Sequence, residues 1–278
     1  MQSVAHLEAC GQESMARELR WLVEQSIPET MDHVRQSLAA ISFLESRPGR
    51  HAARASSQVS IAAEGAGVSG TATVSGAAMT QLSLTVPEHG QTAHEAAKTT
   101  VYLKKGETLP LRQALDARCY ARAALDRLEE LQQFDSCGDA LVYIEGVLGS
   151  IQDARRMLAA ESRLGAAPLH TGSSEKFAPP LPQNTAVECG LDGCALVVRV
   201  YWVRPRQGIQ STGLLDAFTR EQSTGQTVVH DGRLAEVTRE AVLQAPLEEL
   251  QRDLARLDRA AGDCIDAIGQ LHAFDCVL

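Results

Sequence analysis

Residues 246–274 read PLEELQRDLARLDRAAGDCIDAIGQLHAF, and this stretch decides the fold. Its apolar residues recur at alternating steps of three and four and form one heptad seam: Leu247, Leu250, Leu254, Leu257, Ala261, Cys264, Ile268 and Leu271. Charged residues lie between them, so the spacing predicts an amphipathic helix whose first turn contains Pro246. The apolar stripe must be buried, either in a zipper between two chains or in a helical bundle within one chain.

The composition is typical of a soluble globular protein. Hydrophobic residues make up 44% and charged residues 22% of the 278 residues. The net charge of −9 argues against nucleic acid and against anionic membrane surfaces, and no apolar run approaches the roughly 20 residues that span a bilayer. The N-terminus lacks the pattern of a secretory signal, and seven scattered cysteines indicate a reducing compartment. We therefore expect a cytoplasmic protein that binds no nucleic acid and does not insert directly into a membrane.

Three further segments show helical apolar spacing. The first, residues 13–45, contains Ser26 and Glu29 at the spacing of a capping box on either side of Pro28, so we expect a kink or restart near Ser26. The other two, residues 110–134 and 139–164, are separated by a short break. That break predicts an antiparallel helical hairpin.

Arg155 is the one polar residue in the seam of the segment 139–164. A polar seam residue either specifies a partner helix or extends its charged end into solvent. We favour extension into solvent.

Between the helices, the apolar period changes to two. Residues 57–105 predict three or four short antiparallel strands, and residues 226–243 predict another strand pair. Residues 186–204 predict a hairpin around Asp192-Gly193, in which Cys189 lies opposite Leu196.

This order of elements predicts an α+β protein with two domains built from separated segments. The helical domain combines residues 13–45, 107–165 and 244–278 in an antiparallel four-helix bundle that contains both termini. The mainly antiparallel β domain combines residues 57–105 and 177–243. In this arrangement the final helix packs within its own chain.

Motifs for chemistry are weak throughout. Residues 65–70 match G-x-G-x-x-G, but a strand-like segment follows where a nucleotide site needs a helix, so we expect a glycine-rich turn. Cys189 and Cys194 lack a second metal-binding pair, and His94-Glu95 lacks the second histidine of a zinc protease. We expect no catalytic, cofactor-binding or metal-binding residues. An enzyme of the hydrolase or nucleotide-binding type is the less favoured alternative.

Dispersed segments, in the right order, resemble the Rogdi family. Residues 18–22 resemble its opening helix, and residues 70–78 with 82–84 its first β-segment. Residues 116–118, 232–237 and the terminal leucine helix complete a resemblance that covers most of residues 15–274, with departures at Pro28 and 205–230. The most specific match is the proline run, of which these residues carry the family pattern: Phe177, Ala178, Pro179, Leu181 and Pro182.

The resemblance implies a helical domain, a β-rich domain and no enzymatic activity or cofactor. Rogdi-type proteins are the small subunit of the RAVE complex, which re-associates the V1 and Vo sectors of the vacuolar-type proton ATPase. The implied partners are a large β-propeller subunit of the Dmx-like or rabconnectin type and V1 subunits, with peripheral recruitment to vacuolar or endosomal membranes. The alternative function is a homodimeric leucine-zipper scaffold unrelated to the pump.

Overall fold

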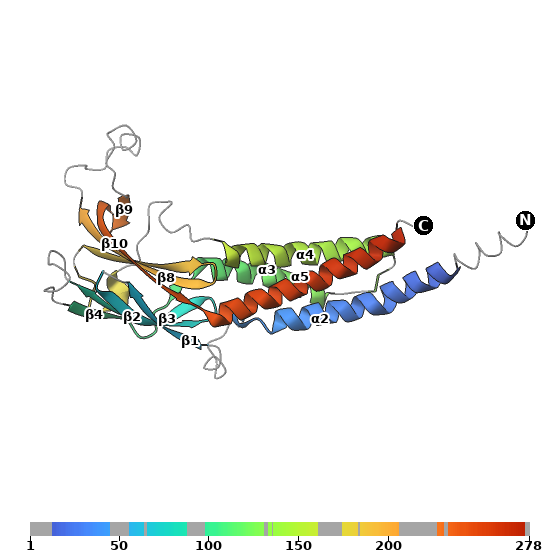
Figure 1. Cartoon of the computed structure of the whole chain (residues 1–278), viewed down its shortest axis with the longest axis horizontal. Helices are drawn as coiled ribbons and strands as arrows, with labels where there is room; N and C mark the ends of the chain where they lie inside the picture. Colours follow the sequence, from blue (N-terminus) through green and yellow to red (C-terminus); the bar gives the residue numbers. More distant parts are fainter. Residues whose placement is uncertain are drawn as a thin grey trace, which may run out of the picture. The chain divides into compact units, whose positions relative to one another are not determined.

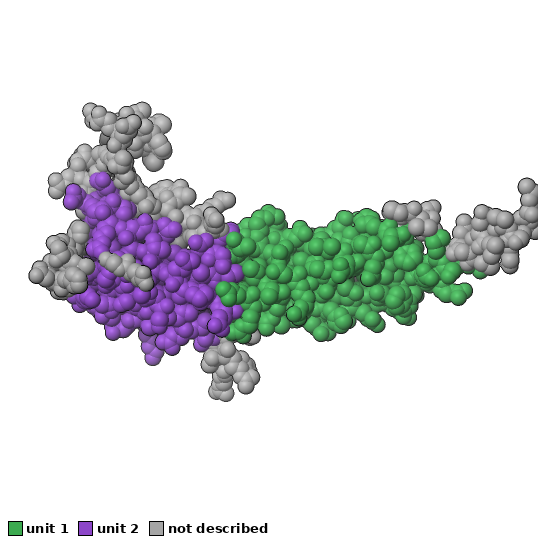
Figure 2. Space-filling model, in the orientation of Figure 1, with its two compact units in different colours: residues 1–47, 114–159, 249–278 green, residues 48–113, 160–248 purple. Residues whose placement is uncertain are grey.

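The computed structural model describes residues 13–44, 56–63, 66–87, 98–130, 133–134, 136–160, 174–182, 184–205, 227–230 and 233–275. It has helices and antiparallel sheets, which confirms the α+β prediction (Figure 1). The chain divides into two compact units (Figure 2). Unit 1 comprises Met1–Arg47, Ala114–Ala159 and Glu249–Leu278, and unit 2 comprises Pro48–Gln113 and Ala160–Glu248.

The long helices of the described residues lie largely within the segments of helical apolar spacing. In chain order the helical segments are a helix over 13–21, the π-helical turn η1 (Leu22–Ser26), α2 (Ile27–Ala39), the 3-10 turn η2 (Ser42–Leu44), α3 (Arg112–Glu129), α4 (Cys137–Ala159), the 3-10 turn η4 (Ser174–Lys176) and α5 (Glu248–Asp275). Small side chains let other helices approach the buried face of α3, as shown by its buried alanines: Ala114, Ala117, Ala121 and Ala124. The ends of the predicted bundle, residues 1–12 and 276–278, lie outside the described residues.

The first helix does not restart at Ser26, so the predicted capping box is wrong. Ser26 has a helical backbone, with φ of −66°, and its side chain makes no capping hydrogen bond. The chain instead widens into η1, where the Ile27 N–H donates to the Leu22 carbonyl five residues earlier. In an α-helix the ring of Pro28 would clash with the carbonyl four residues before it. A wider turn relieves that clash without ending the helix.

The start of the final helix also differs from the prediction. Pro246 is the last residue of strand β10 and pairs with Ala195. The next residue, Leu247, donates its N–H to the Cys194 carbonyl at 3.2 Å, and α5 begins at Glu248. Pairing with the neighbouring strand therefore extends to the residue that the local sequence alone assigns to a helical turn.

Two polar contacts fix α5 within unit 1. The Asp253 carboxylate, which is fully buried, accepts hydrogen bonds from the Ser42 N–H at 3.0 and 3.1 Å and from the Ser42 hydroxyl at 2.5 Å. Asp258 forms an ion pair with Arg155 of α4. Arg155 therefore has a partner on another helix, while its side chain remains 41% exposed.

Unit 2 contains two antiparallel sheets. The first has the order β1-β2-β3-β4-β6, with β5 paired to β3, and its strands are β1 (Ser56–Ala63), β2 (Val68–Ser75), β3 (Ala78–Pro87), β4 (Lys98–Leu103), β5 (Leu109–Pro110) and β6 (Phe177–Ala178). The second has the order β7-β8-β10-β9, and its strands are β7 (Thr185–Asp192), β8 (Ala195–Pro205), β9 (Thr227–His230) and β10 (Arg233–Pro246). Strands β1 to β4 and the pair β9–β10 confirm the predicted strands.

The β7–β8 hairpin turns one residue later than predicted. Asp192, predicted to lie in the turn, pairs with Ala195 instead, and the two turn residues are Gly193 and Cys194, with φ of 50° and 68°. Two positive φ values match the twist that a tight hairpin needs. Cys189 therefore lies opposite Val198, and the predicted pairing with Leu196 is wrong.

Candidate functional site

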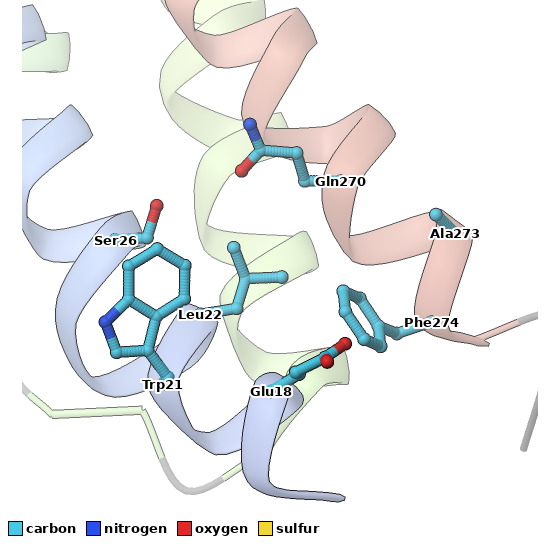
Figure 3. Close-up of a pocket in the computed structure, with 7 residues that line it drawn as sticks. All are labelled: Glu18, Trp21, Leu22, Ser26, Gln270, Ala273 and Phe274. Carbon is cyan, nitrogen blue, oxygen red and sulfur yellow. The ribbon is translucent and has the colours of Figure 1, made fainter. Parts of the chain in front are cut away.

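A cavity of about 400 Å³ opens in unit 1, beside the last turns of α5 (Figure 3). Its lining residues come from two segments at opposite ends of the chain: Glu18, Trp21, Leu22, Ser26, Gln270, Ala273 and Phe274. Trp21 and Phe274 lie on either side of Leu22 in the view of Figure 3. The wall is thus largely apolar, with a few polar groups, which is the usual make-up of a binding pocket.

Trp21 is exposed and lies directly before the π-helical turn. Leu22 and Val23 are both buried, and the next buried position is Ile27, five residues after Leu22. This five-residue step keeps the core side of the helix continuous, whereas Trp21 is 57% exposed. Single π-helical turns occur frequently at functional sites. The local backbone therefore presents a large aromatic side chain at the cavity.

The polar groups of the cavity are unpaired within the described part of the chain. The side chains of Glu18, Ser26 and Gln270 make no hydrogen bond or ion pair with another described residue. By contrast, the exposed carboxylates of Asp32 and Asp258 each pair with an arginine. The cavity thus combines aromatic surface with an available carboxylate.

A second group of polar side chains lies on one face of the sheet β7-β8-β10 in unit 2. The Tyr201 hydroxyl donates to the Glu188 carboxylate at 3.1 Å, and Arg199 donates to Glu240 at 3.0 Å. Burial raises the pKa of Glu188 above its ordinary value, although the Tyr201 hydrogen bond and the Arg199 charge oppose it. Burial also raises the pKa of Tyr201. These four side chains form two hydrogen-bonded pairs within the sheet, while the buried Nε of Arg199 has no hydrogen-bond partner among the described residues. We take the cavity in unit 1 as the candidate site because it offers an open apolar volume to a ligand.

The predicted seam of the final helix is largely buried. Leu250, Leu257, Ala261, Cys264 and Leu271 are buried, whereas Leu254 and Ile268 are half-buried. Leu247 is buried too, but it precedes α5 and belongs to unit 2. Burial raises the pKa of the Cys264 thiol to about 12. The seam residues therefore contribute to packing within this chain.

The proline run is attached to the first sheet of unit 2. Phe177 is buried and pairs with Leu103 of β4. Leu181 is buried, Pro182 is half-buried, and Ala178 and Pro179 are exposed. Two buried apolar side chains, Phe177 and Leu181, thus anchor the run at either end of an exposed stretch.

The chemical motifs behave as structural elements where they are described. Gly67 has a φ of 69° and lies in a turn, and strand β2 begins at Val68, which confirms the predicted glycine-rich turn. Burial raises the pKa of the Cys189 thiol to about 12. His94, Glu95 and Gly65 lie outside the described residues.

No group of three or more histidine, cysteine, aspartate or glutamate side chains in the described ranges could hold a metal ion. No helix in the same ranges is long and apolar enough to span a bilayer.

The comparison with known families identifies the chain. The family model for Rogdi leucine zipper containing protein matches residues 18–239. The chain belongs to this family. No curated protein matches it. The match confirms the resemblance to the Rogdi family and includes the proline run, but it ends in β10, before α5 begins. The zipper-like helix of this Rogdi-family protein therefore lies beyond the matched residues.

Sequence patterns alone did not identify the cavity. The sequence pattern linked residues 18–22 only to the family resemblance and residues 270–274 only to the end of the final helix. One signal was present: Trp21 falls outside the apolar stripe that includes Leu19 and Val23. A large aromatic residue on the polar side of an amphipathic helix is typical of a contact surface.

Proposed function

We propose that this Rogdi-family protein is a non-enzymatic adaptor subunit of a RAVE-type complex. It promotes reassembly of V1 with Vo of the vacuolar-type proton ATPase by binding a large β-propeller subunit, of the Dmx-like or rabconnectin type, and V1. The observation that carries the proposal is the family match over residues 18–239. The adaptor works in the cytoplasm and reaches vacuolar or endosomal membranes through its partners.

The state of the buried thiols supports a non-enzymatic role. Nucleophilic cysteines have a lowered pKa, because the thiolate is the reactive form. Burial raises the pKa of both Cys189 and Cys264 to about 12. So high a pKa favours the protonated thiol at neutral pH, which supports a structural role for both cysteines.

We also propose that unit 1 is an antiparallel four-helix bundle formed by α2, α3, α4 and α5, with both chain ends in it. The buried apolar stripes on all of these helices support this arrangement. So do the Ser42–Asp253 hydrogen bonds and the Arg155–Asp258 ion pair, which connect α5 to segments near α2 and in α4. Such a bundle offers a long outer surface for partners.

The second candidate is a homodimeric leucine-zipper scaffold, which the heptad spacing of α5 favours. Its weakness is that Leu257, Cys264 and Leu271 are already fully buried within one chain. Self-pairing through the seam would require α5 to leave that environment. Light scattering over a range of concentrations separates the two candidates, since a concentration-independent monomer excludes the zipper.

Affinity capture with the tagged full chain in native lysate tests the adaptor role. Recovery of a Dmx-like subunit together with V1 subunits, above the level of an unrelated tagged protein of similar charge, supports the proposal. Reproducible capture that lacks both would overturn it.

A further inference from the structure

We infer that the cavity at Trp21 is a docking site for a partner protein, which fills it with a segment carrying a large apolar side chain next to a lysine or arginine. The inference rests on the proposed function, because it names one surface through which the adaptor would hold a partner. Three features of the cavity support it: an exposed aromatic wall, an unpaired carboxylate and its size.

The apolar part of the cavity calls for an apolar side chain. Trp21 is the most exposed of the large aromatic side chains in the described residues, and Leu22 beside it is buried. Phe274 and Ala273 extend the apolar wall from α5. Interface residues that contribute most to binding are enriched in tryptophan, next to a hydrophobic pocket that excludes water. A partner's leucine or phenylalanine side chain against Trp21 would meet this description.

The charge of the cavity selects a basic neighbour for that apolar residue. Glu18 is the only carboxylate among the lining residues, and no described residue pairs with it. The exposed Asp32 and Asp258, by comparison, each bind an arginine. A lysine or arginine head group would form a charge-assisted hydrogen bond with Glu18 and lie near the aromatic rings of Trp21 and Phe274. An acidic segment would instead place like charges together.

The size of the cavity fits more than one side chain. Its volume of about 400 Å³ lies in the range of roughly 300–1,000 Å³ that is usual for binding pockets. On a helix, residues three or four positions apart lie about 5–6 Å from each other, so an apolar residue and a basic residue at this spacing can enter together. The net charge of −9 also favours the approach of a basic segment.

Photo-crosslinking from position 21 tests the inference directly. Full-length chain carrying a benzophenone amino acid in place of Trp21 is irradiated in native lysate, and the crosslinked peptides are sequenced by mass spectrometry. The matched control carries the same group in place of Tyr120, an exposed aromatic residue on α3 that does not line the cavity. We expect a crosslink, specific to position 21, to another protein at an apolar residue within four positions of a lysine or arginine.

The other outcomes overturn the inference. They are a crosslink to a second copy of this chain, a crosslink to its own residues, a crosslink to a segment without lysine or arginine, an equal crosslink from position 120, or no crosslink. A second copy would also appear as a concentration-dependent mass in solution.

Substitution of the lining residues gives an independent measurement. Trp21→Ala and Glu18→Arg should each lower recovery of the crosslinked partner at least tenfold, whereas Glu18→Asp should keep at least half of it. Both positions are exposed, so the thermal unfolding midpoint should stay unchanged. Wild-type chain that recovers neither the β-propeller subunit nor V1 would contradict the proposed function. If the wild-type chain recovers these partners and the variants recover them equally well, only the docking site is contradicted.

Discussion

The replacement Asp253→Ala should destabilise unit 1 strongly. Asp253 is fully buried, and its carboxylate accepts hydrogen bonds from the N–H and the hydroxyl of Ser42. Arg256 also donates to it, at 2.8 Å. The replacement leaves both donors of the half-buried Ser42 without their acceptor, which is the costly way to break a hydrogen bond.

The magnitude follows from those contacts. A hydrogen bond to a charged group contributes about 1.5–3 kcal/mol, and two of them are lost at Ser42. Arg256 is partly exposed and regains water, so its contribution is small. The expected loss is therefore about 3–5 kcal/mol. A double-mutant cycle with Ser42→Ala should return a coupling of about 1–3 kcal/mol.

Urea unfolding followed by circular dichroism at 222 nm measures the effect, because the long helices belong to unit 1. Asp258→Ala is the matched control, since it removes the same residue type from the same helix. Asp258 is 47% exposed in its ion pair with Arg155, so its loss should cost about 0–1 kcal/mol. Equal losses for the two variants, or a loss below about 1 kcal/mol for Asp253→Ala, would refute the reasoning.

Two other predictions concern the free energy of unfolding after glycine substitutions and its dependence on pH. Gly70→Ala should destabilise unit 2 by about 1–3 kcal/mol or more, because the added Cβ would lie 2.0 Å from the Ser83 carbonyl oxygen. Gly149→Ala should instead stabilise α4 by about 0.5–1 kcal/mol in the same urea assay, because its added Cβ meets nothing within 4 Å. The raised pKa of Glu188 contributes stability that is full below its unfolded-state pKa and is lost as pH rises through the folded-state value. Glu188→Gln cannot lose a proton, so its urea midpoint should gain on that of the wild type as pH rises, and parallel profiles would contradict the assignment.

The types of elements could be predicted from spacing, but some of their ends could not. Apolar and polar residues alternate over residues 57–105 and follow heptad spacing over residues 247–271. Both patterns reflect which face of the element is buried, and the local order of residues is enough to recognise them. The assignment of Pro246 depends instead on Ala195, its strand partner far along the chain. The residue fits a first helical turn and a strand end equally well. Pairing with Ala195 therefore decides that Pro246 ends a strand.

The β7–β8 register shows the same limit at shorter range. Turns centred on Asp192-Gly193 or on Gly193-Cys194 both place a glycine at a positive φ, and both join the same two strands. The observed turn requires a positive φ at Cys194, which is unfavourable for a side chain with a Cβ. In return, Asp192 keeps its place opposite Ala195, and every pair along the hairpin follows from that one. Packing of whole strands outweighs the preference of one residue.

The cavity could not be predicted because it needs both a tertiary contact and an irregular turn. Residues 18–26 and 270–274 come together only when α5 packs in unit 1. The π-helical turn η1 depends on Pro28, which the sequence marked as a break in the helix. The sequence correctly located the irregularity and misjudged its form.

The width of the buried face of α5 bears on whether its heptads serve a zipper. A two-chain zipper needs a narrow seam of two positions per heptad, whereas a helix in a bundle buries a broader stripe. Ala260, Ala267 and Asp253 lie outside the heptad seam and are nonetheless buried, while the seam residue Leu254 is only half-buried. In a zipper, α5 would leave its place beside Ser42, so Asp253 would lose this partner and the Ser42 donors would lose their acceptor. The buried carboxylate thus favours the position of α5 within its own chain, and heptad spacing alone does not identify a dimer.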